Sequence, residues 1–178
     1  RWRKQDMVEF SIVCPIKDEA DLIPKTLPSF YAVEPSEVVL CFDNPPDWQA
    51  FKIAKRIAEE HADIPTKFVF VSRNPEYAFH QAWVRRSGFL SAKYDRILTT
   101  DIDLVINENV LKAVEMVGKD NIGLVSCSKR YPYKGFQRIW RNITYELVRF
   151  VYPIRFTGLY AIWRPFWLDS EDEGIKKL

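Results

Sequence analysis

The chain has 178 residues, of which 47% are hydrophobic and 28% charged, and its formal net charge at pH 7 is +2. These values are typical of one globular domain with a sizeable core. The nearly balanced charge speaks against a dedicated nucleic-acid surface, and the longest apolar runs are too short to span a membrane.

The two ends of the sequence carry no targeting pattern. The first residues do not read as a signal peptide, and the chain begins with Arg1 rather than Met. The final letters, EGIKKL, are typical of a helix cut in its first turns. We therefore expect a single domain over residues 1–178 that is trimmed at one or both ends.

The three cysteines, Cys14, Cys41 and Cys127, are widely spaced and form no CxxC or Cys/His pattern that would suggest zinc. Free cysteine is among the most buried residue types, so we expect buried free thiols. Free thiols favour a reducing compartment, which makes a cytoplasmic location the expectation.

Four short runs rich in Val, Ile and Phe predict strands. Their apolar residues are continuous rather than alternating, which indicates strands that are covered on both faces. The runs are residues 9–16, 36–43, 66–73 and 95–102.

Helical patterns follow the later strands, over residues 46–62, 78–94 and 107–119. Asn107 is a good N-cap for the last of these. The helix over 78–94 repeats apolar residues at Phe79, Trp83 and Leu90, and we expect these to face the core. The alternation predicts an α/β domain with a Rossmann-like, mostly parallel sheet flanked by helices.

A different composition begins after Cys127. Residues 129–155 mix basic and aromatic side chains, and a helix is expected from about Gln137 to Phe150. This composition is typical of an interfacial anchor, so the segment is a candidate acceptor-binding or membrane-facing element. A strand or turn is expected over residues 157–167.

Carboxylates follow several of the predicted strands. Asp18 and Glu19 follow the first, Asp43 ends the second, and Asp101 and Asp103 end the fourth. In an open α/β sheet the carboxyl ends of parallel strands share one edge, where ligands bind. Single loop aspartates also cap helices or close Asx turns, and that alternative applies to each acid taken alone.

Oxygen ligands favour Mg²⁺ or Mn²⁺, which usually keep waters and share their site with substrate phosphates. The sequence contains neither GxGxxG nor GxxxxGK[ST], so it offers neither of those glycine-rich phosphate-binding motifs. A metal held by a carboxylate pair is the alternative way to bind a diphosphate.

Four blocks of the sequence together resemble family 2 of the glycosyltransferases, with the GT-A nucleotide-diphospho-sugar transferase fold. The opening block contains the turn Pro15-Ile16-Lys17-Asp18-Glu19, and the third contains Arg85, Gly88 and the Asp-Ile-Asp of a DxD motif. Lys17, Asp18 and Phe42 depart from the family pattern, which leaves the identity of the donor open. The blocks are residues 11–30, 38–45, 84–104 and 156–175.

The resemblance implies a donor site for a UDP- or GDP-sugar. It implies that Asp43 and Glu19 hydrogen-bond the base and ribose, that Arg85 lies near the base, and that Pro15 opens the turn beside them. It also implies that Asp101 contacts the ribose, the sugar or the metal.

For the chemistry, the resemblance implies that Asp103 binds Mn²⁺ or Mg²⁺ and that transfer inverts the anomeric centre. It places the general base for the acceptor hydroxyl at Asp172, the second acid of the Glu171-Asp172 pair. An acidic helix N-terminus is an alternative explanation of the acids around Asp172. The acceptor is either soluble or lipid-linked, and a lipid-linked one would put the enzyme at the cytoplasmic face of a membrane.

Other functions fit parts of the same sequence. The letters DIDLV also match the nucleophile loop of haloacid-dehalogenase phosphatases, in which the first aspartate attacks phosphorus. That motif normally opens its domain, whereas here three strand units precede it. A nucleotidyltransferase would share the fold type and the metal. A non-catalytic nucleotide-sugar-binding domain would keep Asp43 and Asp103.

Overall fold

The computed structural model describes residues 8–77, 79–127 and 159–165. Strands and helices alternate along most of this length, as the sequence predicts. The elements are β1 (Ser11–Ile16), α1 (Ile23–Ala32), β2 (Glu37–Asp43), α2 (Trp48–Glu60), β3 (Thr66–Val71), α3 (His80–Ser91), β4 (Arg96–Thr100), α4 (Val110–Met116), β5 (Leu124–Ser126) and β6 (Leu159–Trp163).

The strands form one six-stranded sheet in the order β3-β2-β1-β4-β6-β5. β2 pairs in parallel with β1 and β3, and β1 pairs in parallel with β4. β6 runs antiparallel to its two neighbours, β4 and β5. The predicted α/β class with a mostly parallel sheet is therefore confirmed. The chain leaves β1 toward β2 on one side and later returns to β4 on the other, which makes the β1–β4 boundary the topological switch point.

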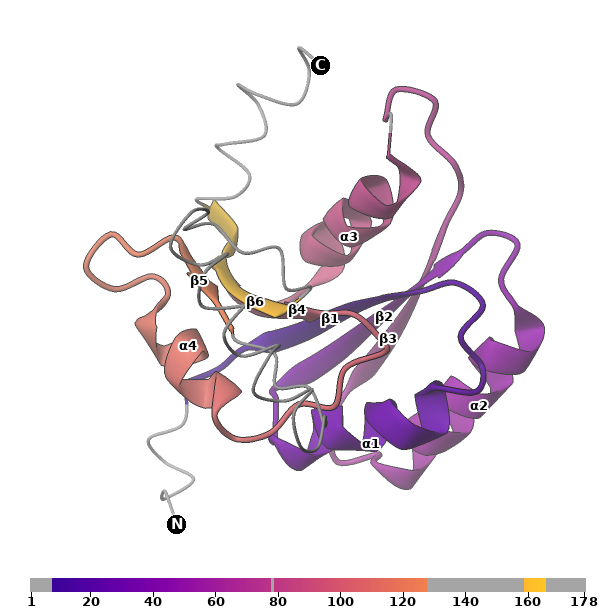
Figure 1. The fold of residues 1–178 in the computed structure, drawn as a ribbon, viewed down its shortest axis with the longest axis horizontal. Helices are drawn as coiled ribbons and strands as arrows, with labels where there is room; N and C mark the ends of the chain where they lie inside the picture. Colours follow the sequence, from indigo (N-terminus) through magenta and orange to yellow (C-terminus); the bar gives the residue numbers. More distant parts are fainter. Residues whose placement is uncertain (1–7, 78, 128–158, 166–178) are drawn as a thin grey trace, which may run out of the picture.

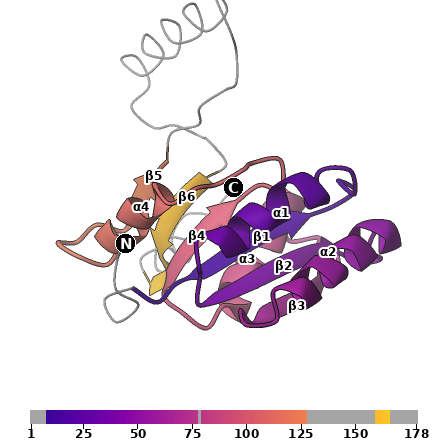
Figure 2. The same ribbon diagram turned by 90° about the horizontal axis from the view of Figure 1, so that it is seen from below.

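Helices cover both faces of the sheet, with α1 and α2 on one face and α3 on the other (Figures 1 and 2). The division follows the alternation of strand side chains. Leu40 and Phe42 pack in the cluster that contains the α1 and α2 residues, whereas Val39 and Cys41 pack in the cluster that contains Val84 of α3. This two-sided burial explains why the strand sequences are apolar without a break.

The apolar face of α3 differs from the predicted one. Phe79 precedes the helix and is 78% exposed, and Leu90 is 52% exposed, whereas Val84 and Phe89 are buried. Gly88 explains the difference, because a Cβ there would lie 2.5 Å from Cγ1 of Val13. The helix thus packs on the sheet through a glycine, which a search for large apolar side chains does not detect.

The start of α4 also differs from the predicted one. The helix begins at Val110, although Asn107 was the expected N-cap. The Asn107 side chain does accept a hydrogen bond from the backbone N–H of Asn109, at 3.0 Å. Asn107 therefore closes an Asx turn that leads into the helix instead of capping it directly.

The cysteines occupy apolar surroundings. All three are free, with Cys14 and Cys41 buried and Cys127 half-buried. Burial raises the pKa of the Cys41 thiol to about 12 and also raises that of Cys14. The three thiols are free as predicted, and the predicted burial holds for Cys14 and Cys41, whose raised pKa favours the unreactive thiol form. In the part of the chain that the structure describes, no helix is both long and apolar enough to cross a bilayer.

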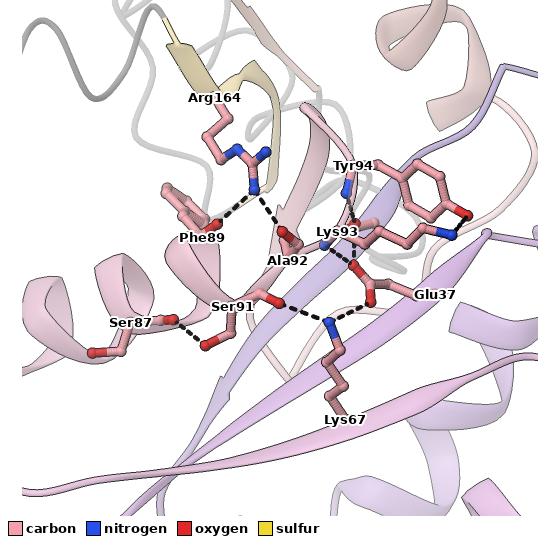
Figure 3. A network of polar contacts seen from close by, with 10 residues as sticks. Glu37, Lys67, Ser87, Phe89, Ser91, Ala92, Lys93, Tyr94 and Arg164 are labelled. Atoms are coloured by element: carbon pink, nitrogen blue, oxygen red, sulfur yellow. Dashed lines mark hydrogen bonds and ion pairs between the residues drawn. The ribbon is translucent and has the colours of Figure 1, made fainter.

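A buried carboxylate fastens the C-terminal end of α3 to the sheet (Figure 3). Glu37, at the start of β2, accepts hydrogen bonds from the Ser11 hydroxyl at 2.6 Å and from the backbone N–H of Lys93. Its other oxygen lies 3.2 Å from Nζ of Lys67, which also donates to the carbonyl of Ser91 at 2.9 Å. Glu37 thus links β1, β2 and β3 to the end of the helix that carries His80 and Arg85.

Replacing Glu37 with alanine is expected to lower the free energy of unfolding by about 3 kcal/mol, because two donors lose their acceptor in a buried site. The matched control is Glu59→Ala, since the ion pair of Glu59 with Lys55 is exposed and spans 3.9 Å. That change should cost less than about 0.5 kcal/mol. Urea unfolding measures both, and equal losses would show that the Glu37 network contributes no more than a surface pair.

Candidate functional site

The carboxyl ends of β1, β2 and β4 form the rim of the candidate site. Asp43 is the last residue of β2, and Asp101 directly follows β4. The register places Ile16 of β1 beside Phe42 of β2, and Val13 of β1 beside Thr99 of β4. Asp43 and Asp101 therefore flank the end of β1 from its two sides, at the switch point of the sheet.

Asp101 is paired with a cation from α3. Nη2 of Arg85 forms an ion pair with Oδ1 of Asp101, and Nη1 of Arg85 donates to Oγ1 of Thr99 at 3.3 Å. Both charged side chains are partly buried. The pair compensates the charge of a carboxylate that follows a buried strand, and it fixes the position of Asp101 relative to α3.

Asp103 lies in a different environment from Asp101, although only one residue separates them. Ile102 between them is buried, and the backbone N–H of Leu104 donates to the carbonyl of Asp101 at 3.2 Å. The side chain of Asp103 is exposed at this turn. The structure therefore distinguishes the two acids of the DxD motif by burial: Asp101 is partly buried and paired with Arg85, whereas Asp103 is exposed.

Glu19 shapes the loop after β1. Its Oε2 accepts the backbone N–H groups of Lys17, at 2.7 Å, and of Asp18, at 3.1 Å. The carboxylate thus stabilises the turn that leads from β1 to α1. Pro15 lies within β1, half-buried and beside Cys41 of β2.

Asp43 has a partner that the sequence did not indicate. Nε2 of His80 lies 3.0 Å from Oδ1 of Asp43, and both side chains are partly buried. His80 is the first residue of α3, and its side chain is only partly exposed. The two residues are 37 positions apart and meet only because α3 packs against β2, so no local sequence signal could have revealed the pair.

Phe42 accounts for one departure from the family pattern. Its side chain is fully buried on the face opposite Asp43, with ring centroids 5.8 Å from Phe51 and 6.1 Å from Phe70. An acid at this position would place a carboxylate in the α2-facing core without a cation beside it in this aromatic cluster. The substitution thus extends the core and leaves Asp43 as the only acid at the end of β2.

The loop after β3 packs beside the end of β2. The Asn44 side chain donates to the hydroxyl of Ser72 at 2.9 Å, and Nε1 of Trp83 donates to the carbonyl of Ser72 at 3.1 Å. Tyr77 lies against Trp83, with ring centroids 4.8 Å apart. These contacts connect the residue after Asp43 to α3, and so they support the Asp43–His80 pair from the side.

The acids of the rim fit a hard divalent cation rather than a closed zinc site. No group of three or more His, Cys, Asp or Glu side chains could hold a metal ion within residues 8–77, 79–127 and 159–165. The turn after β4 offers at most two carboxylates, those of Asp101 and Asp103. Mg²⁺ and Mn²⁺ accept such a sparse oxygen set, because they complete their coordination with water and substrate phosphates.

Two of the predicted features cannot be placed. Asp172, the residue to which the resemblance assigns the general base, and the basic aromatic segment 129–155 both lie outside the described residues. The predicted strand or turn at 157–167 does fall partly inside, where β6 covers Leu159–Trp163.

Comparison with known proteins agrees with this geometry. A family model described as glycosyl transferase family 2 matches residues 11–169. The structure of the mannosyltransferase PcManGT from Pyrobaculum calidifontis, in complex with GDP-Man and Mn²⁺, is similar with a TM-score of 0.70 and 22% sequence identity. That of S. aureus TarS 1–349 in complex with UDP has a TM-score of 0.60 and 14% identity.

The two alignments cover 93% and 96% of this chain, but only 49% and 53% of the other two. The chain thus spans about half the length of the solved structures it resembles. No curated protein matches it. At these levels of identity the likeness concerns the fold, and it confirms the predicted GT-A architecture.

Proposed function

Because the chain belongs to glycosyl transferase family 2, we propose that it moves a sugar from a nucleotide-diphosphate donor to a hydroxyl acceptor, with inversion at the anomeric centre and with the help of a divalent cation. The observation that carries the proposal is the arrangement at the switch point. The edge where α/β sheets bind their ligands carries three acids in this structure. They are Asp101, which is paired with Arg85, Asp43, which contacts His80, and the exposed Asp103.

In this proposal the donor lies across the rim, with its base toward β2 and its diphosphate toward β4. Asp43 accepts hydrogen bonds from the base, and the turn shaped by Glu19 lies beside the ribose. Arg85 keeps Asp101 in place near the sugar and diphosphate. A complex of one structural relative with GDP-Man and of another with UDP supports a nucleotide-sugar donor.

Asp103 holds the cation in this proposal, with Asp101 as the second carboxylate of the site. When bound, Mn²⁺ or Mg²⁺ supplies Lewis-acid stabilisation of the charge that develops on the departing nucleoside diphosphate. Asp103 is exposed, so solvent reaches this carboxylate. The Mn²⁺ in the similar mannosyltransferase structure supports this choice of cofactor.

The acceptor must lose a proton as its hydroxyl attacks the anomeric carbon. A carboxylate that binds the cation cannot also take this proton, so the base is another group. We assign it to Asp172, the position that the resemblance to the family implies. A lipid-linked acceptor and a membrane-facing role for residues 129–155 stay predictions from sequence. The phosphatase alternative is set aside, since its nucleophile loop opens the domain, whereas Asp101 follows the fourth strand of a family 2 glycosyltransferase.

A thermal-shift panel tests the proposal at the level of binding. UDP-, GDP- and dTDP-sugars are added with and without Mn²⁺, and one class is expected to raise the melting temperature only when Mn²⁺ is present. A ligand at a hundredfold excess over its Kd stabilises by about 2.7 kcal/mol, which such a scan resolves. If no nucleotide sugar shifts the transition in either condition, the proposed donor site is wrong. A shift without any turnover would instead indicate a non-catalytic binding domain.

A further inference from the structure

The pairing of Asp43 with His80 has a clear structural origin. Val39, Cys41 and Asp43 alternate along β2 toward the face that α3 covers, and His80 is the first residue of α3. The imidazole therefore meets the carboxylate at the end of the strand, where Nε2 lies 3.0 Å from Oδ1. This contact lies at the rim, where β2 ends and α3 begins.

The hydrogen-bond network assigns the tautomer of His80. A carboxylate can only accept, so Nε2 carries the proton and donates to Asp43. Nδ1 is buried and has no hydrogen-bond partner among the residues that the structure describes.

This arrangement leaves Asp43 as an oriented acceptor. The contact with Nε2 of His80 at 3.0 Å fixes the direction of the carboxylate. A ligand group that donates an N–H toward Asp43 is therefore favoured. A ligand group that presents a lone pair at the same place is repelled, and it leaves the carboxylate desolvated without a donor.

We propose that His80 is a positioning residue that sets the nucleobase specificity of the donor site through Asp43. The site would select bases whose ring edge donates an N–H, such as N3–H of uracil or N1–H of guanine. It would reject cytosine and adenine, whose corresponding ring nitrogens carry a lone pair. The inference rests on the proposed function, since it requires that the donor nucleotide binds at this rim.

The test measures the dissociation constants of UDP, CDP, GDP and ADP for the whole chain by titration calorimetry with Mn²⁺. The wild type should prefer UDP over CDP, or GDP over ADP. His80→Ala should weaken binding of the preferred nucleotide by roughly tenfold, the size of one hydrogen bond to a charged group, and leave its counterpart nearly unchanged. The selectivity ratio therefore falls, which a loss of general stability would not cause.

Three further variants sharpen the result. His80→Gln keeps an N–H donor and should recover most of the selectivity, whereas His80→Leu fills the space without donating and should behave like alanine. His61→Ala is the matched histidine control, because His61 stacks on Tyr31 with ring centroids 4.5 Å apart and does not contact Asp43. This control should keep the wild-type ratio.

Two results overturn the inference while leaving the proposed function intact. In the first, His80→Ala and His80→Leu bind the nucleotides with the wild-type selectivity ratio. In the second, they lose affinity equally for all four nucleotides. Failure of the wild type to bind any of the four is a different result, since it overturns the proposed donor site and this inference with it.

Discussion

Asp103→Asn is expected to lower sugar transfer by at least about 100-fold, because the site loses the charge that holds the cation and with it several kcal/mol of transition-state stabilisation. The amide keeps the shape of the side chain, and Asp103 is exposed, so the free energy of unfolding should change by less than about 0.5 kcal/mol. Donor affinity, measured over a range of Mn²⁺ concentrations, should no longer respond to the metal.

The control for Asp103→Asn is the same change at Asp63, which is exposed in the loop between α2 and β3. This variant should keep wild-type transfer and metal dependence. Asp101→Asn would be a poorer test, because it also breaks the ion pair with Arg85. A lower activity would then not distinguish the loss of a metal ligand from a displacement of the side chain. An Asp103→Asn variant that binds donor with unchanged metal dependence would show that the cation is held elsewhere.

Asp172→Asn is expected to lower transfer by about 10²- to 10⁴-fold, the usual contribution of a general base. The acceptor hydroxyl must give up its proton on the face away from the leaving diphosphate. Asp101 is paired with Arg85, and Asp103 holds the cation in the proposed mechanism, so neither is expected to take this proton. Donor and metal affinity should stay nearly unchanged, so the loss should appear in kcat. Steady-state kinetics with the transferred sugar as readout measures it.

The neighbouring acid provides the matched comparison for Asp172. Glu173→Gln removes the same charge one position along the chain, and its effect on transfer should be far milder. If the acids 169–173 serve only to favour a helix N-terminus, both variants should lower stability slightly and transfer should be similar in both. Full transfer by Asp172→Asn would assign the base to another residue.

The fold was largely predictable because its strands are buried on both faces. Continuous apolar runs mark such strands strongly, and the predicted runs agree with β1 to β4 to within about two residues at each end. The parallel order then brings Asp43 and Asp101 to one edge without further information. By contrast, β5 spans only Leu124–Ser126, and a strand of this length leaves no pattern of its own.

The contacts that orient the site residues were not predictable. Arg85 and Asp101 are 16 positions apart and His80 and Asp43 are 37 apart, so each pair forms only through the packing of α3 on the sheet. That packing depends on Gly88, whose missing side chain gives no apolar signal. The resemblance to a family indicated which residues matter, and the structure adds how they are held.

Consumption of the donor tests the central claim most directly. UDP- or GDP-sugar is incubated with the chain and a membrane extract as the source of acceptor, and release of the nucleoside diphosphate is followed by chromatography. We expect release by the wild type with Mn²⁺, and almost none after chelation by EDTA or with Asp103→Asn. Release that continues at the wild-type rate in EDTA and in Asp103→Asn would contradict a metal-dependent glycosyltransferase site at this rim.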